Sequence, residues 1–233
     1  MSTKLPEKGG ELEFLDSLAR ASTRRKFLQW SGMTIAVAAI GCSDDSNGPG
    51  STGGVDLGSG DTGVLNYAYA LEQLEAAFYT QVAASFYASA TTDEQSIITD
   101  IKNHEVIHRD FLKAALGSSA IADLTVDFTS INFTDRSDVL GAAKTFEDLG
   151  VSAYNGAGKL LTNPDNLLVA GKIVSVEARH AAAIRDLLVA NSFAGSDVVN
   201  ANGLDQANSP STVLAAADPF ITTTVTANNL PTT

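Results

Sequence analysis

The residues best suited to chemistry in this 233-residue chain are glutamates and histidines at a repeated spacing. His108 follows Glu105 by three residues, and His180 follows Glu177 by three residues. On a helix, residues three apart lie on one face, so each pair would present a carboxylate and an imidazole in the same direction. Because the chain has only three histidines, the duplication indicates a shared physical cause rather than chance.

Two more glutamates extend this repeat. Glu75 lies thirty residues before Glu105, and Glu147 lies thirty residues before Glu177. If each interval turns near its midpoint, two antiparallel helices bring the two members of each pair to the same height. The offset between the two halves is 72 residues for the single glutamates and for the Glu-x-x-His pairs. The pattern therefore predicts an internal repeat of two helical hairpins with their polar side chains at one level.

Four carboxylates inside a bundle would be strongly destabilising without positive charge, since an unpaired buried carboxylate costs several kcal/mol. Arg109 and Arg179 are expected to point away from these faces, whereas two divalent metal ions would cancel four negative charges. Oxygen and imidazole donors without a thiolate are typical of iron or manganese sites, with zinc as an alternative on affinity. The six candidate metal ligands are Glu75, Glu105, His108, Glu147, Glu177 and His180.

The elements that must position these side chains are helices. Apolar residues recur at three- and four-residue steps, with Glu72 to one side of the first apolar stripe. Between the second and third helices, residues 118–136 lose this period and favour an extended crossover. We therefore predict an all-α fold, a four-helix bundle of two antiparallel helical hairpins joined by a long crossover. The predicted helices span about residues 62–89, 92–116, 137–161 and 164–191.

Residues 62–191 resemble the ferritin-like di-iron carboxylate superfamily, specifically its bacterial exported ferritin-like domain proteins, some described as desiccation-related. The resemblance implies that Glu75 and Glu147 are terminal carboxylates. It implies that Glu105 and Glu177 bridge two metal ions, and that His108 and His180 each complete the ligands of one ion. The expected metal is iron, with manganese as the alternative. The matching stretches are Leu71-Glu72-Gln73-Leu74-Glu75-Ala76-Ala77-Phe78-Tyr79, Glu105-x-x-His108, Glu147 with Tyr154, and Val176-Glu177-Ala178-Arg179-His180.

The resemblance implies a reaction with O₂ or peroxide, of a ferroxidase, peroxidase or catalase-like kind, in protection against oxidative or desiccation stress. Tyr79 and Tyr154 are expected to be core residues or neighbours of the ligands rather than radical sites. One alternative is a non-catalytic stress or binding protein in which the metals only hold the bundle together. Both hypotheses share the dinuclear centre and differ in whether it turns over.

A third hypothesis is a zinc peptidase, because His104-Glu105-x-x-His108 matches the short motif of such enzymes. In that case His104 and His108 would bind zinc and Glu105 would act as the general base. The hypothesis leaves Glu75, Glu147 and the pair Glu177-x-x-His180 without a role. The two hypotheses differ on His104, which the peptidase requires and the dinuclear centre does not.

The N-terminal stretch is typical of an export signal. Arg24 and Arg25 form a twin-arginine pattern before a short apolar run, and Cys42 is the only cysteine. We predict a lipoprotein-type signal peptide over residues 1–41, export by the twin-arginine route, and a lipid anchor at Cys42 on the periplasmic side or cell surface. The alternative is ordinary cleavage nearby and free secretion. Residues 42–61 are predicted to be a flexible linker.

The composition, 44% apolar and 18% charged, suits one globular domain. Without residues 1–41 the chain carries nine basic and 23 acidic residues, a net charge of −14. Such a surface would repel nucleic acid and attract cations, so no nucleic-acid partner is expected, while a homo-oligomer stays open. Residues 192–233 are predicted to form a mostly irregular, disordered tail. One helical turn at Pro210–Ala217 is expected to dock Phe220 or Ile221 on the bundle.

Overall fold

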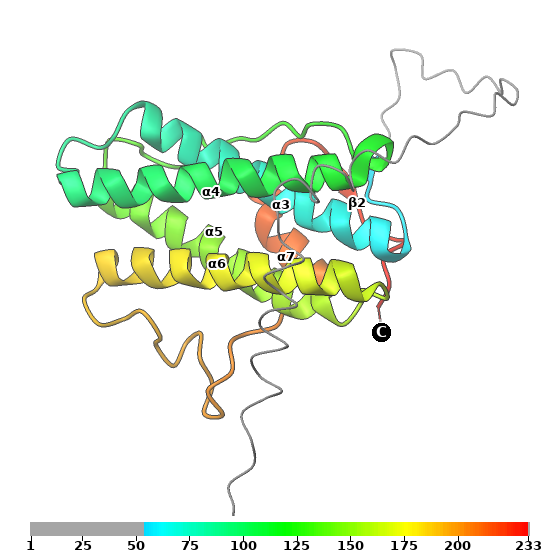
Figure 1. Cartoon of the computed structure of the whole chain (residues 1–233). Coiled ribbons are helices and arrows are strands. Elements are labelled where there is room, and N and C mark those ends of the chain that lie inside the picture. The colour runs from blue at the N-terminus through cyan, green and yellow to red at the C-terminus, as the bar shows by residue number, and fades with distance from the viewer. Residues whose placement is uncertain (1–53, 233) are drawn as a thin grey trace, which may run out of the picture. The chain divides into compact units, whose positions relative to one another are not determined.

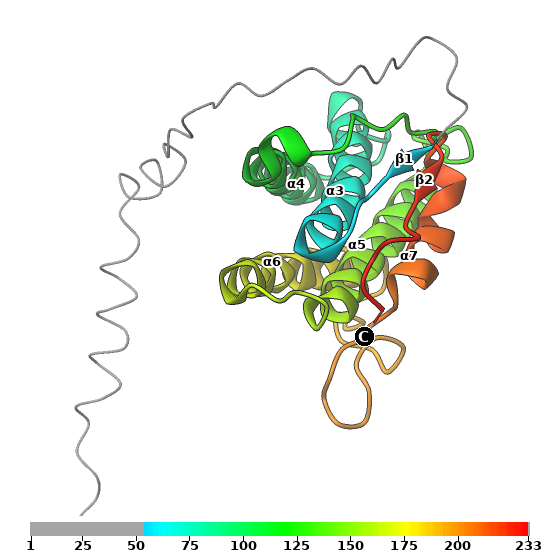
Figure 2. The ribbon, with the colours of Figure 1, turned by 90° about the vertical axis from the view of Figure 1, so that its right-hand side faces the viewer.

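The computed structural model describes residues 54–232, which fold as a four-helix bundle with two helical hairpins (Figure 1). Helix α3 packs on α4 and helix α5 packs on α6, while the hairpins meet chiefly through α3 and α5 (Figure 2). This confirms the predicted fold class. Arg24, Arg25 and Cys42 lie outside the described residues. The helices of the bundle are α3 (Gly60–Ala84), α4 (Thr92–Leu116), α5 (Arg136–Gly158) and α6 (Pro164–Leu188).

The helix starts are specified by local sequence. Thr91 and Glu94 form a capping box at the start of α4, in which each side chain accepts a hydrogen bond from the other residue's backbone N–H. Asn163 caps α6, whose first residue is Pro164. Helix α3 ends at Ala84, five residues before the predicted end, because the chain turns into an extended connection. That connection buries Tyr87, which leaves only 2% of its surface exposed.

Residues 117–135 form the crossover between the two hairpins, beginning with a 3₁₀ turn, η1 (Gly117–Ser119). Asn66 on α3 holds this segment in place. Its side-chain amide donates to the carbonyl oxygens of Leu57, at 3.1 Å, and Ser119, at 2.9 Å, and its Oδ1 accepts from the backbone N–H of Ile121 at 3.0 Å. The crossover prediction is confirmed, and one buried amide joins it to the bundle.

The folded part extends beyond the predicted bundle at its N-terminal side. Strand β1 (Val55–Asp56) pairs in parallel with strand β2 (Val225–Thr226), and Leu57 is fully buried. The predicted flexible linker, 42–61, therefore does not hold for residues 54–61. Residues 54–61 are ordered because Val55 and Asp56 pair with residues 170 positions later, and composition alone does not reveal such a pairing.

The C-terminal segment is also ordered, in contrast to the predicted disordered tail. Helix α7 (Pro210–Ala217) forms at the predicted residues and packs on α5 (Figure 2). A 3₁₀ turn, η2 (Asp218–Phe220), then places the ring of Phe220 4.8 Å from that of Phe146, centroid to centroid. Ile221 and Leu230 are buried, so the segment from α7 to Thr232 covers one side of the bundle.

Over residues 54–232, no helix combines the length and apolar character needed to cross a bilayer.

Replacing Asn66 by Leu should destabilise the domain by about 2–4 kcal/mol, because three backbone groups, two of them in buried hydrogen bonds, lose their partner. Chemical denaturation followed by circular dichroism measures this difference. Asn103→Leu, at an exposed position on α4, is the matched control and should change stability by less than about 0.5 kcal/mol. Equal stability of the two variants would show that Asn66 does not hold the crossover.

Candidate metal centre

Two overlapping groups of buried carboxylates and imidazoles lie in the middle of the bundle. Within each group, one donor atom from each side chain lies within 4.8 Å of the others. Glu105 and Glu177 belong to both groups, which is the arrangement that two adjacent metal ions with shared carboxylates would require. The first group is Glu72, Glu105, His108 and Glu177, and the second is Glu105, Glu147, Glu177 and His180.

All four helices of the bundle supply donors to this cluster. Helices α3 and α5 each contribute one glutamate, Glu72 and Glu147. Helices α4 and α6 each contribute a Glu-x-x-His pair, whose two members share one helix face as the spacing predicts. The four carboxylates of the two groups are fully buried, so neither bulk water nor surface cations neutralise them.

The contacts within the cluster are short but are not hydrogen bonds. His108 Nδ1 lies 2.8 Å from Glu177 Oε1, and His180 Nδ1 lies 2.8 Å from Glu105 Oε1. None of these four atoms has a partner in hydrogen-bond geometry. Donors bound at right angles to one metal ion at about 2.1 Å lie about 3 Å from each other. The side chains thus converge on common points rather than on one another, and the residues fit bound metal ions.

In the metal-free protein, bound protons neutralise part of the negative charge of the cluster. Burial opposes charge on the His108 imidazole, but contacts with Glu105 and Glu177 outweigh it and raise the pKa to about 12. The pKa of His180 rises to about 10, because contacts with Glu105 and Glu147 likewise outweigh the effect of burial. Burial also opposes charge on Glu105, yet its contacts with both histidines lower its pKa to about 2.

The remaining carboxylates resist ionisation. Burial, with the nearby charges of Glu177 and Glu105, raises the pKa values of Glu72 and Glu75 well above the usual value. Burial raises the pKa of Glu147 to about 8, although contact with His180 opposes the rise. The cluster therefore holds more acidic groups than its two imidazoles can balance, which favours the binding of cations.

Five of the six candidate ligands fall in the two donor groups, while Glu75 falls in neither. On α3 the structure instead places Glu72, which the sequence pattern put to one side of the apolar stripe, beside His108 and Glu177. Glu72 Oε2 lies 3.5 Å from His108 Nδ1. The two donor groups thus contain Glu72 at the place where the sequence-based ligand set has Glu75.

The cause of this difference is the length of the hairpin connections. Both Glu-x-x-His pairs begin thirteen residues after the first residue of their helix. The connection from α3 to α4, residues 85–91, is two residues longer than that from α5 to α6, residues 159–163. Glu72 and Glu147 lie twelve and eleven residues before the ends of their helices, whereas Glu75 lies only nine before. The glutamate of α3 that lies at the same height as Glu147 and the two Glu-x-x-His pairs is therefore Glu72, about one helical turn before Glu75.

Glu75 is nevertheless part of the buried interior. It is only 3% exposed, and its Oε2 has no hydrogen-bond partner. A Cβ at Gly150 on α5 would lie 2.9 Å from Glu75 Oε1 and 3.5 Å from Glu177 Oε2. The absence of a side chain at Gly150 thus leaves room for carboxylates. Glu75 is a fifth buried carboxylate beside the four in the donor groups.

Two tyrosines, Tyr79 and Tyr154, occupy equivalent positions in the two halves of the site. Tyr154 follows Glu147 by seven residues and donates a hydrogen bond of 2.5 Å to Glu72 Oε1 on the opposite hairpin. Tyr79 follows Glu72 by seven residues; burial and the nearby charge of Glu147 raise its pKa well above the usual value. Each tyrosine therefore lies next to the glutamate of the other hairpin. This agrees with the prediction that both are core residues or neighbours of the ligands.

His104 is not placed as a zinc peptidase would require. It belongs to neither donor group, and its Nδ1 instead lies 2.9 Å from Nε2 of His180. Glu105, which would be the general base of the peptidase, takes part in both donor groups. The arrangement favours a dinuclear centre over a mononuclear peptidase site.

A four-helix bundle with single glutamates on two helices and Glu-x-x-His pairs on the other two has the architecture of dinuclear carboxylate proteins. A family model described as a ferritin-like domain matches residues 60–190. Because that match covers more than half of the chain, the chain belongs to the ferritin-like domain family. No curated protein matches it.

The metal-free protein should lose stability as pH rises from about 5 to about 9. Glu147, with its pKa raised to about 8, and the two histidines hold protons in the folded state that the unfolded chain releases. The stability these groups contribute is complete below their unfolded pKa values and is lost as pH passes their folded values. Melting temperatures of chelator-treated protein across this range test the expectation.

Glu147→Gln is the matched variant for this measurement, because an amide cannot lose a proton. Its metal-free form should show a smaller decline between pH 5 and pH 8 than the unaltered chain. A melting temperature of the unaltered metal-free chain that rises over this range would contradict the description of the cluster.

Proposed function

We propose that this protein binds two metal ions in the buried cluster and uses them to react with O₂ or peroxide. The observation that carries the proposal is the sharing of Glu105 and Glu177 between two groups of donors. A single metal ion would not require a second histidine and a second terminal carboxylate on the other side. Iron is the expected metal and manganese the alternative, because the donors are carboxylates and imidazoles.

The residues of the chain have distinct parts in this proposal. Glu105 and Glu177 would bridge the two ions, Glu72 and His108 would complete one position, and Glu147 and His180 the other. When bound, the ions would supply electron transfer and polarisation of the oxygen substrate. The list of proposed ligands is therefore Glu72, Glu105, His108, Glu147, Glu177 and His180.

The surrounding helices exclude water from this chemistry. The four carboxylates of the donor groups are fully buried, and His180 is 5% exposed. Water-free surroundings strengthen the electrostatic hold on the ions and protect reactive species from hydrolysis.

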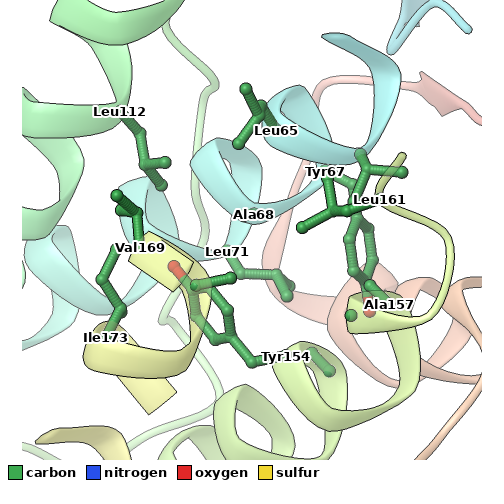
Figure 3. Close-up of a pocket in the computed structure, with 14 residues that line it drawn as sticks. Leu65, Tyr67, Ala68, Leu71, Leu112, Tyr154, Ala157, Leu161, Val169 and Ile173 are labelled. Carbon is green, nitrogen blue, oxygen red and sulfur yellow. The ribbon is translucent and has the colours of Figure 1, made fainter. Parts of the chain in front are cut away.

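An apolar pocket at one end of the bundle supports O₂ as a substrate. Leu65, Leu71, Leu112 and Ile173 are among the side chains that line it (Figure 3). Tyr154 also lines the pocket, and its hydroxyl donates to Glu72 in the cluster. An apolar gas enters such surroundings at little cost, whereas peroxide would lose its hydrogen bonds to water. The pocket thus favours O₂ over peroxide.

We further propose that the protein is exported by the twin-arginine route and anchored through Cys42, with a role in oxidative or desiccation stress. The support for export and anchoring is the sequence pattern around Arg24, Arg25 and Cys42. Residues that would carry these signals lie outside the described part of the chain. The mass of the protein isolated from cell membranes, compared with the mass calculated for the unprocessed chain, would reveal cleavage before Cys42 and an attached lipid.

The metal content of the purified protein tests the main proposal. We expect two Fe(II) ions per chain after anaerobic loading, and a change in near-ultraviolet absorbance when O₂ is added. Glu105→Gln should reduce binding at both positions, because Glu105 belongs to both donor groups. Asp100→Asn, an exposed carboxylate on the same helix, is the matched control and should retain both ions.

Two outcomes would contradict the proposal. Full metal content in Glu105→Gln would show that Glu105 is not shared. Two bound ions that raise the melting temperature but give no spectral change with O₂ or peroxide would favour the alternative, in which metals only hold the bundle together.

A paired substitution tests which glutamate of α3 is a ligand. Glu72→Gln should lose or weaken one of the two metal positions by about 10-fold or more, since an amide is a poorer ligand than a carboxylate. Glu75→Gln should retain two ions, because Glu75 lies outside both donor groups. The opposite result in metal titrations would restore Glu75 as the ligand.

A further inference from the structure

His104 is the one histidine outside the two donor groups, and it contacts a proposed ligand directly. Its Nδ1 lies 2.9 Å from Nε2 of His180. The two ring planes are within 6° of parallel, and their centroids are 5.1 Å apart. With the nitrogens so close, this separation places the rings edge to edge in a common plane rather than face to face. That is the in-line geometry of an N–H···N hydrogen bond.

This hydrogen bond defines the tautomers of both rings. A histidine binds a metal through a nitrogen lone pair, and Nδ1 of His180 is the atom that faces Glu105, at 2.8 Å. Nε2 of His180 must then carry the proton and donate it to Nδ1 of His104. An acceptor on the outer nitrogen fixes the ring orientation of a ligand and increases the basicity of its inner nitrogen. His104 supplies that acceptor.

The other proposed histidine ligand lacks such a partner. The internal repeat of 72 residues places Val176 on α6 at the position that His104 occupies on α4. A valine side chain offers no hydrogen-bond acceptor. Every contact recorded for His108 with a carboxylate involves Nδ1, and its Nε2 has no hydrogen-bond partner within residues 54–232. The two halves of the cluster therefore differ although their proposed ligands match.

We infer that His104 is a positioning residue that makes the two metal positions unequal. The position that includes His180 and Glu147 binds its ion more tightly than the position that includes His108 and Glu72. This inference rests on the proposed dinuclear centre and adds an order of filling to it. Loss of an outer hydrogen bond to a ligating histidine lowers metal affinity by about 10–100-fold, which sets the expected difference.

An anaerobic titration of the metal-free full chain with Co(II), followed by visible absorption and calorimetry, tests the inference. The unaltered chain should bind two Co(II) ions, the first at least about 10-fold more tightly than the second. His104→Leu should weaken the first binding step by about 10–100-fold and leave the second nearly unchanged. His104→Asn should retain most of the first affinity, because its side-chain oxygen can occupy the place of Nδ1.

Controls separate this effect from a general loss of structure. Asn103→Leu, the exposed neighbour on α4, should keep both affinities. Melting temperatures of the metal-free variants show whether His104→Leu still folds. If it does not, the comparison of His104→Asn with the unaltered chain decides, since a loss of the tight site in that variant would overturn the role of the acceptor.

The outcomes distinguish the inference from the proposed function. Two Co(II) ions bound with equal affinity by the unaltered chain would overturn the inference and leave the dinuclear centre intact. The same holds if His104→Leu keeps the tight step or weakens both steps equally. A chain that binds no Co(II) would overturn the proposed function and the inference together.

Discussion

The constraint on which the structure depends is the burial of five carboxylates inside a helical bundle. Glu72, Glu105, Glu147 and Glu177 are fully buried, and Glu75 is 3% exposed. Two imidazoles cannot balance this number of acidic groups, so several must hold protons or meet cations. A core of this composition is costly to fold and is retained where the charges serve binding. The apolar helix faces, the helix caps and the packed segments that flank the bundle stabilise the fold and offset this cost.

The sequence was sufficient to predict the bundle, the crossover and five of the six side chains in the two donor groups. Four long periodic segments and the repeated Glu-x-x-His pairs carry that information locally. The choice between Glu72 and Glu75 could not be predicted from spacing, because the exact 72-residue offset favoured Glu75. Helices α3 and α5 follow an offset of 75, as the pairs of Glu72 with Tyr79 and Glu147 with Tyr154 show. A seven-residue interval from glutamate to tyrosine on both helices was the signal that could have identified Glu72.

Apart from the predicted helix α7, the ordered segments that flank the bundle within residues 54–232 could not be predicted, for a different physical reason. Polar and small residues near Val55 and after Asn191 lack the periodicity that marks a helix or a long strand. Their order comes from contacts between distant segments, such as the pairing of β1 with β2 and the burial of Leu57 and Leu230. Such contacts depend on surfaces that exist only after the bundle has formed. Short strands of two residues leave little trace in a sequence.

Glu75 bears on the charge balance of the cluster if two divalent ions bind there. Four ionised carboxylates match the charge of two divalent ions, so a fifth carboxylate in the same interior must stay neutral while the ions are divalent. In the metal-free protein, burial and the charges of Glu177 and Glu105 already raise the pKa of Glu75 well above its usual value. Gly150, its counterpart at the 75-residue offset, has no side chain, and a Cβ there would lie only 2.9 Å from Glu75 Oε1. The duplicated site is thus asymmetric in two places, at Glu75 opposite Gly150 and at His104 opposite Val176.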